Sequence, residues 1–448
     1  MKITLLQPRY PFGKRQAYLP GGLMNLGSRL LQIGVKVEFF DLNDGDWSEW
    51  CSTLEESDLI GFTTIGPPYI PEIVGTIRDM RKAGLEQTIL VGGEGASRLR
   101  PSDFQCWFSG LNVLQICGDQ DLTAVCGMEV PDAFETSMVP MLELLNEDQL
   151  RKYLTTEFSL FTSQGCAFNC AFCAADKARK EKYRSCESLA DEVEFVCRYL
   201  QSVGHLELRV YITNLDAFQN AGELEERLQI VRTICDRYGI IPHIRCLATS
   251  RCTFKACQAD SGLAQRLRDC GLEIVGFGAD GADEETWARQ NKNHNSLSEL
   301  QEACRMVEHV GITVELLMVI GFQDDDAGTL WRDLVFSLRQ AVIGRVIRPY
   351  LAKSQTPSAR WPEGDILVEA FLEKSELLAR LDYAMIGSRQ THPKWWHRLM
   401  TNAVYLAIIV LLTPFGKCPT SPLIPVPVSK GIGRTVALMI NRFIPFDR

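Results

Sequence analysis

The feature that most constrains the fold is a regular alternation of short apolar runs with stretches of helical periodicity, which occurs twice along the 448 residues. Such an alternation predicts a parallel sheet whose strands are joined by crossover helices. For the first series we predict a doubly wound parallel-sheet α/β domain over residues 1–130. Its predicted strands are residues 3–6, 35–42, 59–63, 89–91 and 113–116.

A second series follows residues 131–154, which contain Pro131 and Pro140 and which we interpret as a linker. Its six strand–helix units occupy about 195 residues and are fewer than the eight of a closed barrel. This count predicts an open, partial (β/α)6 barrel over residues 155–385. The predicted strands are residues 158–162, 206–213, 243–247, 273–278, 313–320 and 345–351.

Residues 386–448 form a basic and apolar C-terminal extension. Its apolar run, residues 403–412, follows Trp395 and Trp396 and is shorter than the roughly 20 residues that a membrane-spanning helix needs. Two interpretations stay open, an interfacial helix at a membrane surface and a buried helix that closes the open barrel. Residues 389–448 hold eight basic residues and one acidic residue, Asp447, and this charge of +7 suits an anionic membrane surface.

Composition and charge exclude several classes of protein. With 46% hydrophobic and 23% charged residues, the chain has the composition of a folded protein. The net charge of −9 leaves −16 on the chain outside the extension, which argues against a nucleic-acid partner. The 16 cysteines are too sparse for a disulfide scaffold, and no signal peptide precedes the first predicted strand. We therefore expect a cytoplasmic protein with reduced thiols, peripheral at the membrane if the extension binds lipid.

Three closely spaced cysteines carry the strongest chemical signal. Cys166, Cys170 and Cys173 form a Cys-x3-Cys-x2-Cys arrangement directly after the first predicted barrel strand. Three thiolates can ligate three irons of a 4Fe-4S cluster and leave the fourth iron open for a small molecule. The loops at the carboxyl ends of barrel strands are also where such folds carry their active sites.

Two alternatives to this cluster follow from the same residues. Structural zinc would need a fourth ligand, from Cys186, Cys197 or a more distant Cys or His. The other alternative is chance clustering, since 16 cysteines in 448 residues sometimes fall close together.

The cysteine motif, with Phe172 just before its last thiol, resembles the signature of radical S-adenosylmethionine enzymes. The resemblance extends over roughly residues 155–351, and the first 130 residues look like the cobalamin-binding domain of one large subclass. Further matching pieces are Tyr-Arg-Ser at 183–185, Gly-Phe-Gly-Ala-Asp-Gly-Ala-Asp at 276–283, Val-Ile-Gly-Phe-Gln-Asp at 319–324, Pro-Gly-Gly-Leu at 20–23 and Val-Gly-Gly-Glu at 91–94.

The resemblance implies a reductive cleavage of S-adenosylmethionine at a 4Fe-4S cluster. In the family, one electron from the cluster gives methionine and a 5′-deoxyadenosyl radical that abstracts a substrate hydrogen. Where cobalamin participates, a methylcobalamin often delivers a methyl group to the substrate radical. The electron comes from a donor such as ferredoxin or flavodoxin, and the C-terminal extension suggests a lipid or other small-molecule substrate.

The resemblance also assigns roles to single residues. Phe172 would lie near the adenine or simply pack beneath the loop. Asn214 and Asp216 would lie near the methionine moiety of S-adenosylmethionine, with a solvated loop carboxylate as the alternative. Arg245 is expected to bind the ligand's carboxylate or to form a structural ion pair. The family's acidic residue at the strand end is Ala279 here, so the ribose contact is expected at Asp280.

Two glycines mark the expected cobalamin site in the first domain. Gly92 and Gly93 directly follow a predicted strand, where a loop can approach a ligand closely or simply form a tight turn. The first domain contains no Asp-x-His-x-x-Gly motif, so cobalt has no lower histidine ligand from that motif.

The sequence therefore predicts a radical S-adenosylmethionine enzyme, most concretely a cobalamin-dependent methyltransferase that acts on an unactivated carbon. A cobalamin-free radical epimerase or cyclase is the alternative within the same chemistry. The alternative from another class is a zinc-stabilised binding or scaffold protein. No acid–base catalytic residue is predicted.

Overall fold

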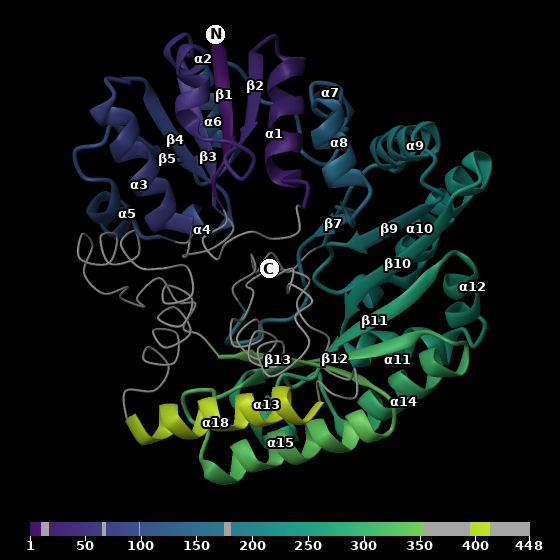
Figure 1. Ribbon diagram of the computed structural model, residues 1–448. Coiled ribbons are helices and arrows are strands. Elements are labelled where there is room, and N and C mark those ends of the chain that lie inside the picture. Colours follow the sequence, from purple (N-terminus) through teal and green to yellow (C-terminus); the bar gives the residue numbers. More distant parts are fainter. Residues whose placement is uncertain (10–17, 65–68, 98, 174–180, 353–394, 413–448) are drawn as a thin grey trace, which may run out of the picture. The chain divides into compact units, whose positions relative to one another are not determined.

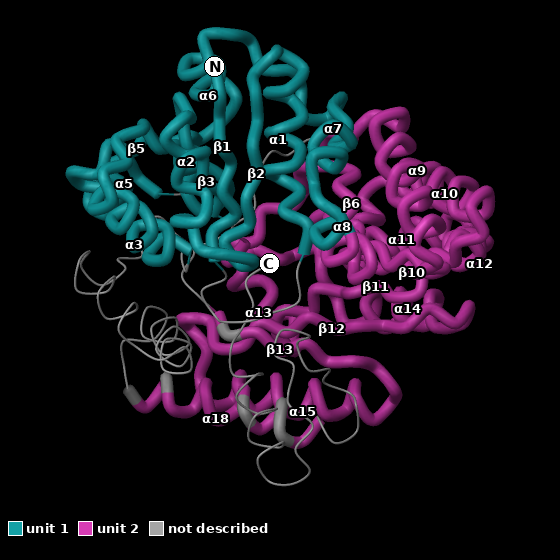
Figure 2. The backbone as a smooth tube through the Cα atoms, turned by 45° about the horizontal axis from the view of Figure 1, so that its top comes forward, with its two compact units in different colours: residues 1–150, 356–383, 446–448 teal, residues 151–355, 384–445 magenta. Residues whose placement is uncertain are grey.

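The protein is described by a computed structural model, which gives the structure of residues 1–9, 18–64, 69–97, 99–173, 181–352 and 395–412 (Figure 1). The chain divides into two compact units (Figure 2). Among the described residues, unit 1 comprises 1–150, and unit 2 comprises 151–352 and 395–412.

Unit 1 is built on a five-stranded parallel sheet with the order β2-β1-β3-β4-β5. The strand order reverses beside β1, as in doubly wound folds, and helices connect the strands. The strands are β1 (Lys2–Gln7), β2 (Lys36–Asp41), β3 (Leu59–Thr63), β4 (Thr88–Gly92) and β5 (Val113–Gln115). The helices are α1 (Gly21–Gln32), α2 (Cys51–Glu55), α3 (Tyr69–Lys82), α4 (Glu94–Ser97), α5 (Pro101–Phe108) and α6 (Asp119–Cys126), with a 3-10 turn at Trp47–Trp50. The predicted doubly wound sheet is confirmed.

The core of unit 1 lies on the central strands, where apolar side chains face the covering helices. Leu5, Ile60 and Ile89 on neighbouring strands are almost completely buried. Strands of a parallel sheet covered on both faces are apolar throughout, which explains why they stood out in the sequence.

The predicted linker, residues 131–154, contains α7 (Val139–Leu142) and α8 (Glu147–Leu154). Its first part packs on α1: the Arg29 guanidinium donates to the Pro131 carbonyl, and the Asn25 side chain donates to the Ala133 carbonyl. The structure therefore includes residues 131–150 in unit 1.

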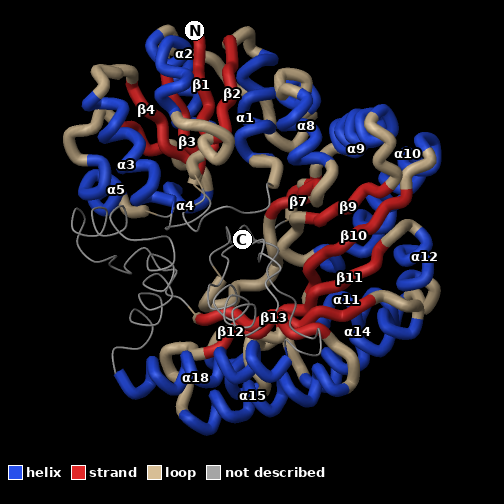
Figure 3. The backbone as a smooth tube through the Cα atoms, viewed as in Figure 1, coloured by secondary structure: helices blue, strands red, loops and turns tan. Residues whose placement is uncertain are grey.

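Unit 2 contains a six-stranded parallel sheet with the order β13-β12-β11-β10-β9-β6 (Figure 3). Within the described residues, β6 and β13 are the two edges and do not pair with each other, so the barrel is open, as predicted. The sheet strands are β6 (Phe158–Leu160), β9 (Glu207–Ile212), β10 (Ile241–Ala248), β11 (Leu272–Gly278), β12 (Thr313–Ile320) and β13 (Val346–Leu351). Two short strands, β7 (Ser163–Gln164) and β8 (Lys182–Tyr183), pair antiparallel.

The helices of unit 2 follow the strands in chain order. They are α9 (Cys186–Ser202), α10 (Ala221–Tyr238), α11 (Ser250–Ala259), α12 (Leu263–Asp269), α13 (Glu284–Arg289), α14 (Leu297–His309) and α15 (Ala327–Val342), with a 3-10 turn at Ala217–Asn220. Most begin at a side-chain cap; for example, the Asp326 carboxylate accepts a hydrogen bond from the Thr329 amide at the start of α15.

One further helix, α18 (Trp395–Leu412), contains the apolar run of the C-terminal extension. It packs against α15 and β13 within unit 2, where Tyr405 and Ile408 are buried (Figure 1). One face of this helix is thus buried in the barrel unit. This agrees with the interpretation of the apolar run as a buried helix. The rest of the predicted extension, residues 386–394 and 413–448, lies outside the described residues. No helix in the described part of the chain is long and apolar enough to cross a membrane.

Candidate functional site

The chain leaves the carboxyl end of β6, an edge strand of the parallel sheet, and passes through the short strand β7. The cysteine loop begins directly after β7. The structure describes the loop up to Cys173 and again from Glu181, just before β8. Because the described part of the loop has no regular helix or sheet hydrogen bonds of its own, contacts with other parts of unit 2 fix its position.

Gln219, in the 3-10 turn after β9, holds the start of the loop. Its side-chain oxygen accepts a hydrogen bond from the Ala167 amide at 2.7 Å, and its nitrogen donates to the Glu181 carboxylate at 2.9 Å. Ser163 and Tyr183 donate to the same carboxylate through their hydroxyls. Both ends of the loop are thereby tied to the loop that follows β9.

The segment between α13 and α14, residues 290–295, holds the other side of the cysteine loop. The Ala171 amide donates to the Gln290 carbonyl at 2.8 Å, and the Asn291 side chain donates to the Asn169 carbonyl at 2.6 Å. Phe168 stacks on His294 with ring centroids 3.7 Å apart. The three cysteines are therefore carried by a loop that is fixed on two sides.

The cysteine thiols lie in a partly buried environment. Burial raises the pKa of Cys166, with a smaller contribution from the Asp216 carboxylate. Burial also raises the pKa of Cys170, to about 11, while the ammonium group of Lys292 acts in the opposite direction. Thiolates at these positions need a compensating cation, which a bound metal cluster supplies.

A zinc ion and an iron-sulfur cluster require different arrangements of their sulfur ligands. A zinc ion needs its sulfur ligands about 2.3 Å from one point, whereas the three ligands of a cubane bind different irons and do not share a point. Within the ranges that the structure describes, no three His, Cys, Asp or Glu side chains converge as ligands of a single ion. Cys197, one proposed fourth zinc ligand, packs in α9 with its sulfur 3.6 Å from that of Cys235 in α10. Three cysteine sulfurs are the donor set that a 4Fe-4S cluster with one open iron requires.

Lys292 is a buried cation beside the loop that sequence analysis did not single out. It is 3% exposed, and its ammonium group lies 2.5 Å from the Asp280 carboxylate and 2.5 Å from the Gly278 carbonyl at the end of β11. The ammonium group also lies 5.9 Å from the centre of the Phe172 ring. Asp280, expected at the ribose, is therefore engaged by Lys292.

The signal for this missed segment is weak in the sequence. Residues 290–295 read Gln-Asn-Lys-Asn-His-Asn, a composition typical of a solvated loop, yet Lys292, His294 and Asn295 are buried. Burial is also the main reason that the pKa of His294 is lowered to about 3, so the imidazole is neutral where it stacks on Phe168. Only the tertiary contact with the cysteine loop reveals the role of this segment.

The residues expected near the methionine moiety are engaged within the protein. Asn214 accepts a hydrogen bond from the Thr162 hydroxyl. Asp216 accepts bonds from the Thr249 amide at 3.0 Å and the Thr249 hydroxyl at 2.7 Å, and burial raises its pKa. These contacts join the loops after β6, β9 and β10, and Asp216 lies close enough to Cys166 to affect its pKa.

Arg245 on β10 forms a bidentate ion pair with Glu157, at 2.6 and 2.8 Å, and stacks over the Tyr211 ring at 4.2 Å. Arg245 therefore forms a structural ion pair, which was the second of the two roles expected for it. Phe172 lies within the cysteine loop. The centre of its ring is 5.4 Å from that of Phe322, which lies in the loop after β12. The structure thus brings Phe172, Asp280 and the cysteine loop together, and engages Arg245 elsewhere.

In unit 1, Gly92 ends β4 and Gly93 follows it with φ +87°. A Cβ atom on Gly93 would lie 2.7 Å from the Thr64 carbonyl oxygen, and one on Gly92 would contact Ile116 at 3.4 Å. The close approach at Gly93 is therefore between the ends of β3 and β4, and the assignment of the two glycines to a cobalamin site stays a prediction.

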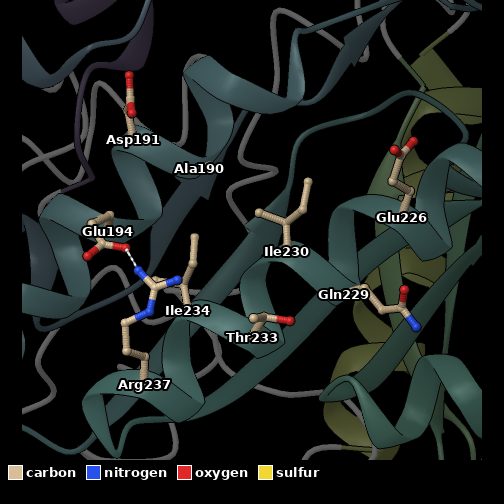
Figure 4. A pocket seen from close by; sticks show the side chains of 9 residues that line it. All are labelled: Ala190, Asp191, Glu194, Glu226, Gln229, Ile230, Thr233, Ile234 and Arg237. Carbon is tan, nitrogen blue, oxygen red and sulfur yellow. Dashed lines mark hydrogen bonds and ion pairs between the residues drawn. The ribbon is translucent and has the colours of Figure 1, made fainter.

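The groove between α9 and α10 does not contain the predicted site (Figure 4). It is open, and its polar lining includes Asp191, Glu194 and Glu226, with Arg237 paired to Glu194 at 2.6 Å. None of the predicted site residues lines it.

Comparison with solved structures identifies the fold. The chain matches the radical S-adenosylmethionine methyltransferase TsrM from Kitasatospora setae, solved with cobalamin and a 4Fe-4S cluster, with a TM-score of 0.59 and 16% identity, over 80% of this chain and 76% of that one. It matches the cobalamin-dependent S-adenosylmethionine radical enzyme OxsB, solved with aqua-cobalamin and S-adenosylmethionine, with a TM-score of 0.59 and 16% identity. That match covers 83% of this chain and 55% of OxsB, so the chain spans little more than half of that protein.

No family model matches the sequence, and no relative is found among curated proteins. At 16% identity, the structural likeness establishes the fold. The chain shares with TsrM and OxsB a fold that combines a five-stranded parallel α/β sheet with an open six-stranded parallel barrel.

Proposed function

We propose that this chain is a radical S-adenosylmethionine enzyme, and most concretely a cobalamin-dependent methyltransferase that acts on an unactivated carbon. The observation that carries the proposal is the Cys-x3-Cys-x2-Cys loop at the carboxyl end of β6 in an open parallel barrel. The shared fold with TsrM and OxsB supports it.

Cys166, Cys170 and Cys173 are the residues that would hold a 4Fe-4S cluster, and unit 1 is where a corrinoid would bind. When bound, these groups supply one electron for the cleavage of S-adenosylmethionine and a transferable methyl group. The chain's own residues position the loop: Gln219 holds its start, and the carbonyl of Gln290 and the side chain of Asn291 hold its far side. The ring of Phe322, which follows β12, lies 5.4 Å from the ring of Phe172, the residue before the last cysteine of the motif.

The remaining partners follow from this chemistry. The reaction needs an external one-electron donor such as ferredoxin or flavodoxin, and its substrate is a small molecule or lipid. Because the thiols must stay reduced, we assign the enzyme to the cytoplasm.

Anaerobic reconstitution with iron and sulfide tests the proposal. We expect the protein to take up about four irons per chain and, with a strong reductant, to convert S-adenosylmethionine to 5′-deoxyadenosine. Cys166→Ala should lose both properties, because it removes a ligand. Cys186→Ala is the matched control and should keep both, since Cys186 lies at the start of α9, after the loop. A wild-type protein with one zinc and no iron would refute the proposal.

Corrinoid content decides between the methyltransferase and a cobalamin-free epimerase or cyclase. We expect protein refolded or expressed with hydroxocobalamin to retain one corrinoid per chain, seen in its absorbance and by mass spectrometry. Stoichiometric iron without any corrinoid would favour the cobalamin-free alternative.

A further inference from the structure

The outward face of α15 is apolar along its whole length. Trp331, Val335, Leu338 and Val342 follow one another at helical spacing and therefore lie on one face. Trp331 is 63% exposed and Val342 is 87% exposed, while the two residues between them are half-buried. The outer face of a helix in a soluble domain is normally polar, so this stripe is unusual.

The neighbouring helix α18 has a similar outward face. Its buried side consists of Thr401, Tyr405, Ile408 and Leu412, which are at helical spacing. The other side presents Leu399 at 62% exposure, together with the exposed Trp396, Ala403 and Leu411. Because α18 packs against α15, the two helices contribute apolar side chains to one region of unit 2 (Figure 1).

The exposed charged residues within α15 are basic. Arg332 pairs with Asp283 at 2.5 Å, and the exposed Asp326 caps the first turn of the helix. On α15 the charged residues are Arg332, Arg339 and Asp333, and only the aspartate is buried. The sequence of α18 contains Arg398 and no acidic residue. Residues 389–448, which include α18, carry a charge of +7.

From this combination we propose that α15 and α18 form a docking surface for an anionic lipid bilayer. Tryptophan and aliphatic side chains insert at the boundary of headgroups and acyl chains, and arginines attract anionic headgroups. Because α18 packs against α15 and β13 and has Tyr405 and Ile408 buried, it would lie along the bilayer surface and not cross it. The proposal does not depend on the radical chemistry.

A second copy of the chain is a poorer occupant of the same surface. In a two-fold interface the patch meets itself, so its arginines would face a partner surface that is also basic. Within the described parts of α15 and α18, Asp333 is the only acidic side chain, and it is buried. Asp326, the exposed cap at the start of α15, is thus the nearest carboxylate along the chain outside these spans, and Arg332 already pairs with Asp283, so a facing copy offers few carboxylates to Arg339.

Vesicle sedimentation of the full-length protein tests the proposal. We expect binding to vesicles of phosphatidylcholine with phosphatidylglycerol, weaker binding to phosphatidylcholine alone, and a loss of binding as salt rises. The double variant Trp331→Ser/Leu399→Ser should bind the anionic vesicles at least about tenfold more weakly, because it removes the two large inserted side chains. Arg339→Gln should weaken binding to the anionic vesicles and leave binding to phosphatidylcholine unchanged.

Leu206→Ser is the matched control, since Leu206 is an apolar residue of unit 2 with 57% exposure that lies outside the two helices. It should bind as the wild type does, and circular dichroism should show that all variants are folded. The proposal fails if the wild type stays in the supernatant with both vesicles, or if Leu206→Ser weakens binding as much as the double variant. It also fails if the protein is a dimer without lipid and the double variant is monomeric, which would assign the surface to a second copy.

Discussion

At the scale of single residues, the buried pair of Lys292 and Asp280 acts electrostatically on Cys170 in the cysteine loop. Lys292 opposes the rise in the pKa of Cys170 more strongly than Asp280 adds to it. The pair therefore presents its positive end to Cys170. Such a charge favours the more negative, reduced form of a bound cluster.

We predict that Lys292→Met/Asp280→Asn lowers the midpoint potential of the reconstituted cluster by tens of millivolts, in order of magnitude. Changing both residues avoids an unpaired buried carboxylate, which would destabilise the fold. The measurement is a redox titration followed by electron paramagnetic resonance. Lys255→Met, at an exposed position of α11, is the control and should leave the potential unchanged. An unchanged or raised potential in the double variant would contradict the assigned role.

The same residues show where sequence reasoning ended. The cysteine spacing was visible because Cys166, Cys170 and Cys173 lie within eight consecutive residues. The position of Lys292 was not visible, because it depends on a loop between α13 and α14 that folds back on a loop more than 100 residues earlier. Likewise, the sequence could not show whether Arg245 pairs with a ligand carboxylate or with a residue of the protein, because its partner Glu157 lies 88 positions away in the chain.

At the scale of elements, the sequence predicted where the strands lie, but it did not predict which polar side chains on the helices are buried. The prediction for β12 coincides with the observed strand, because its residues 316–320 are a continuous apolar run, as is typical of buried parallel strands. By contrast, Asp333 lies on the buried face of α15, where helical periodicity alone would place an apolar residue. Burial raises the pKa of Asp333 to about 8, with further contributions from the nearby Asp325 and Asp283 carboxylates.

This buried carboxyl predicts a stability that falls as pH rises. Between about pH 4 and 8 the folded protein keeps the proton on Asp333 and the unfolded chain does not, so unfolding releases a proton and the free energy of unfolding decreases by up to about 1.4 kcal/mol per pH unit. Asp333→Asn imitates the protonated form, so we expect it to flatten this dependence and to exceed the wild type in stability at pH 8. Denaturant unfolding at several pH values measures the effect. Asp326→Asn alters an exposed cap on the same helix, so a matching change there would show that Asp333 is not the cause.

At the scale of the whole molecule, the two units have separate sheets and separate cores, which the two alternating series in the sequence already indicated. The end of unit 1 was less predictable, because the proline-containing segment after residue 130 packs on α1 through backbone carbonyls, which carry no sequence signal. A sheet with its own core is normally a cooperative unfolding unit.

We therefore predict two thermal transitions that single substitutions shift separately. Gly93→Ala should lower the transition of unit 1, because its Cβ would meet the Thr64 backbone at 2.7 Å in a left-handed conformation. The loss should exceed the ~1–2 kcal/mol of the left-handed conformation alone. Gly34→Ala is the matched control, since it shares a positive φ but has open space around its Cβ position. Asp333→Asn should shift only the other transition at pH 8. Scanning calorimetry measures both, and a single transition displaced by every variant would mean that the two units unfold as one.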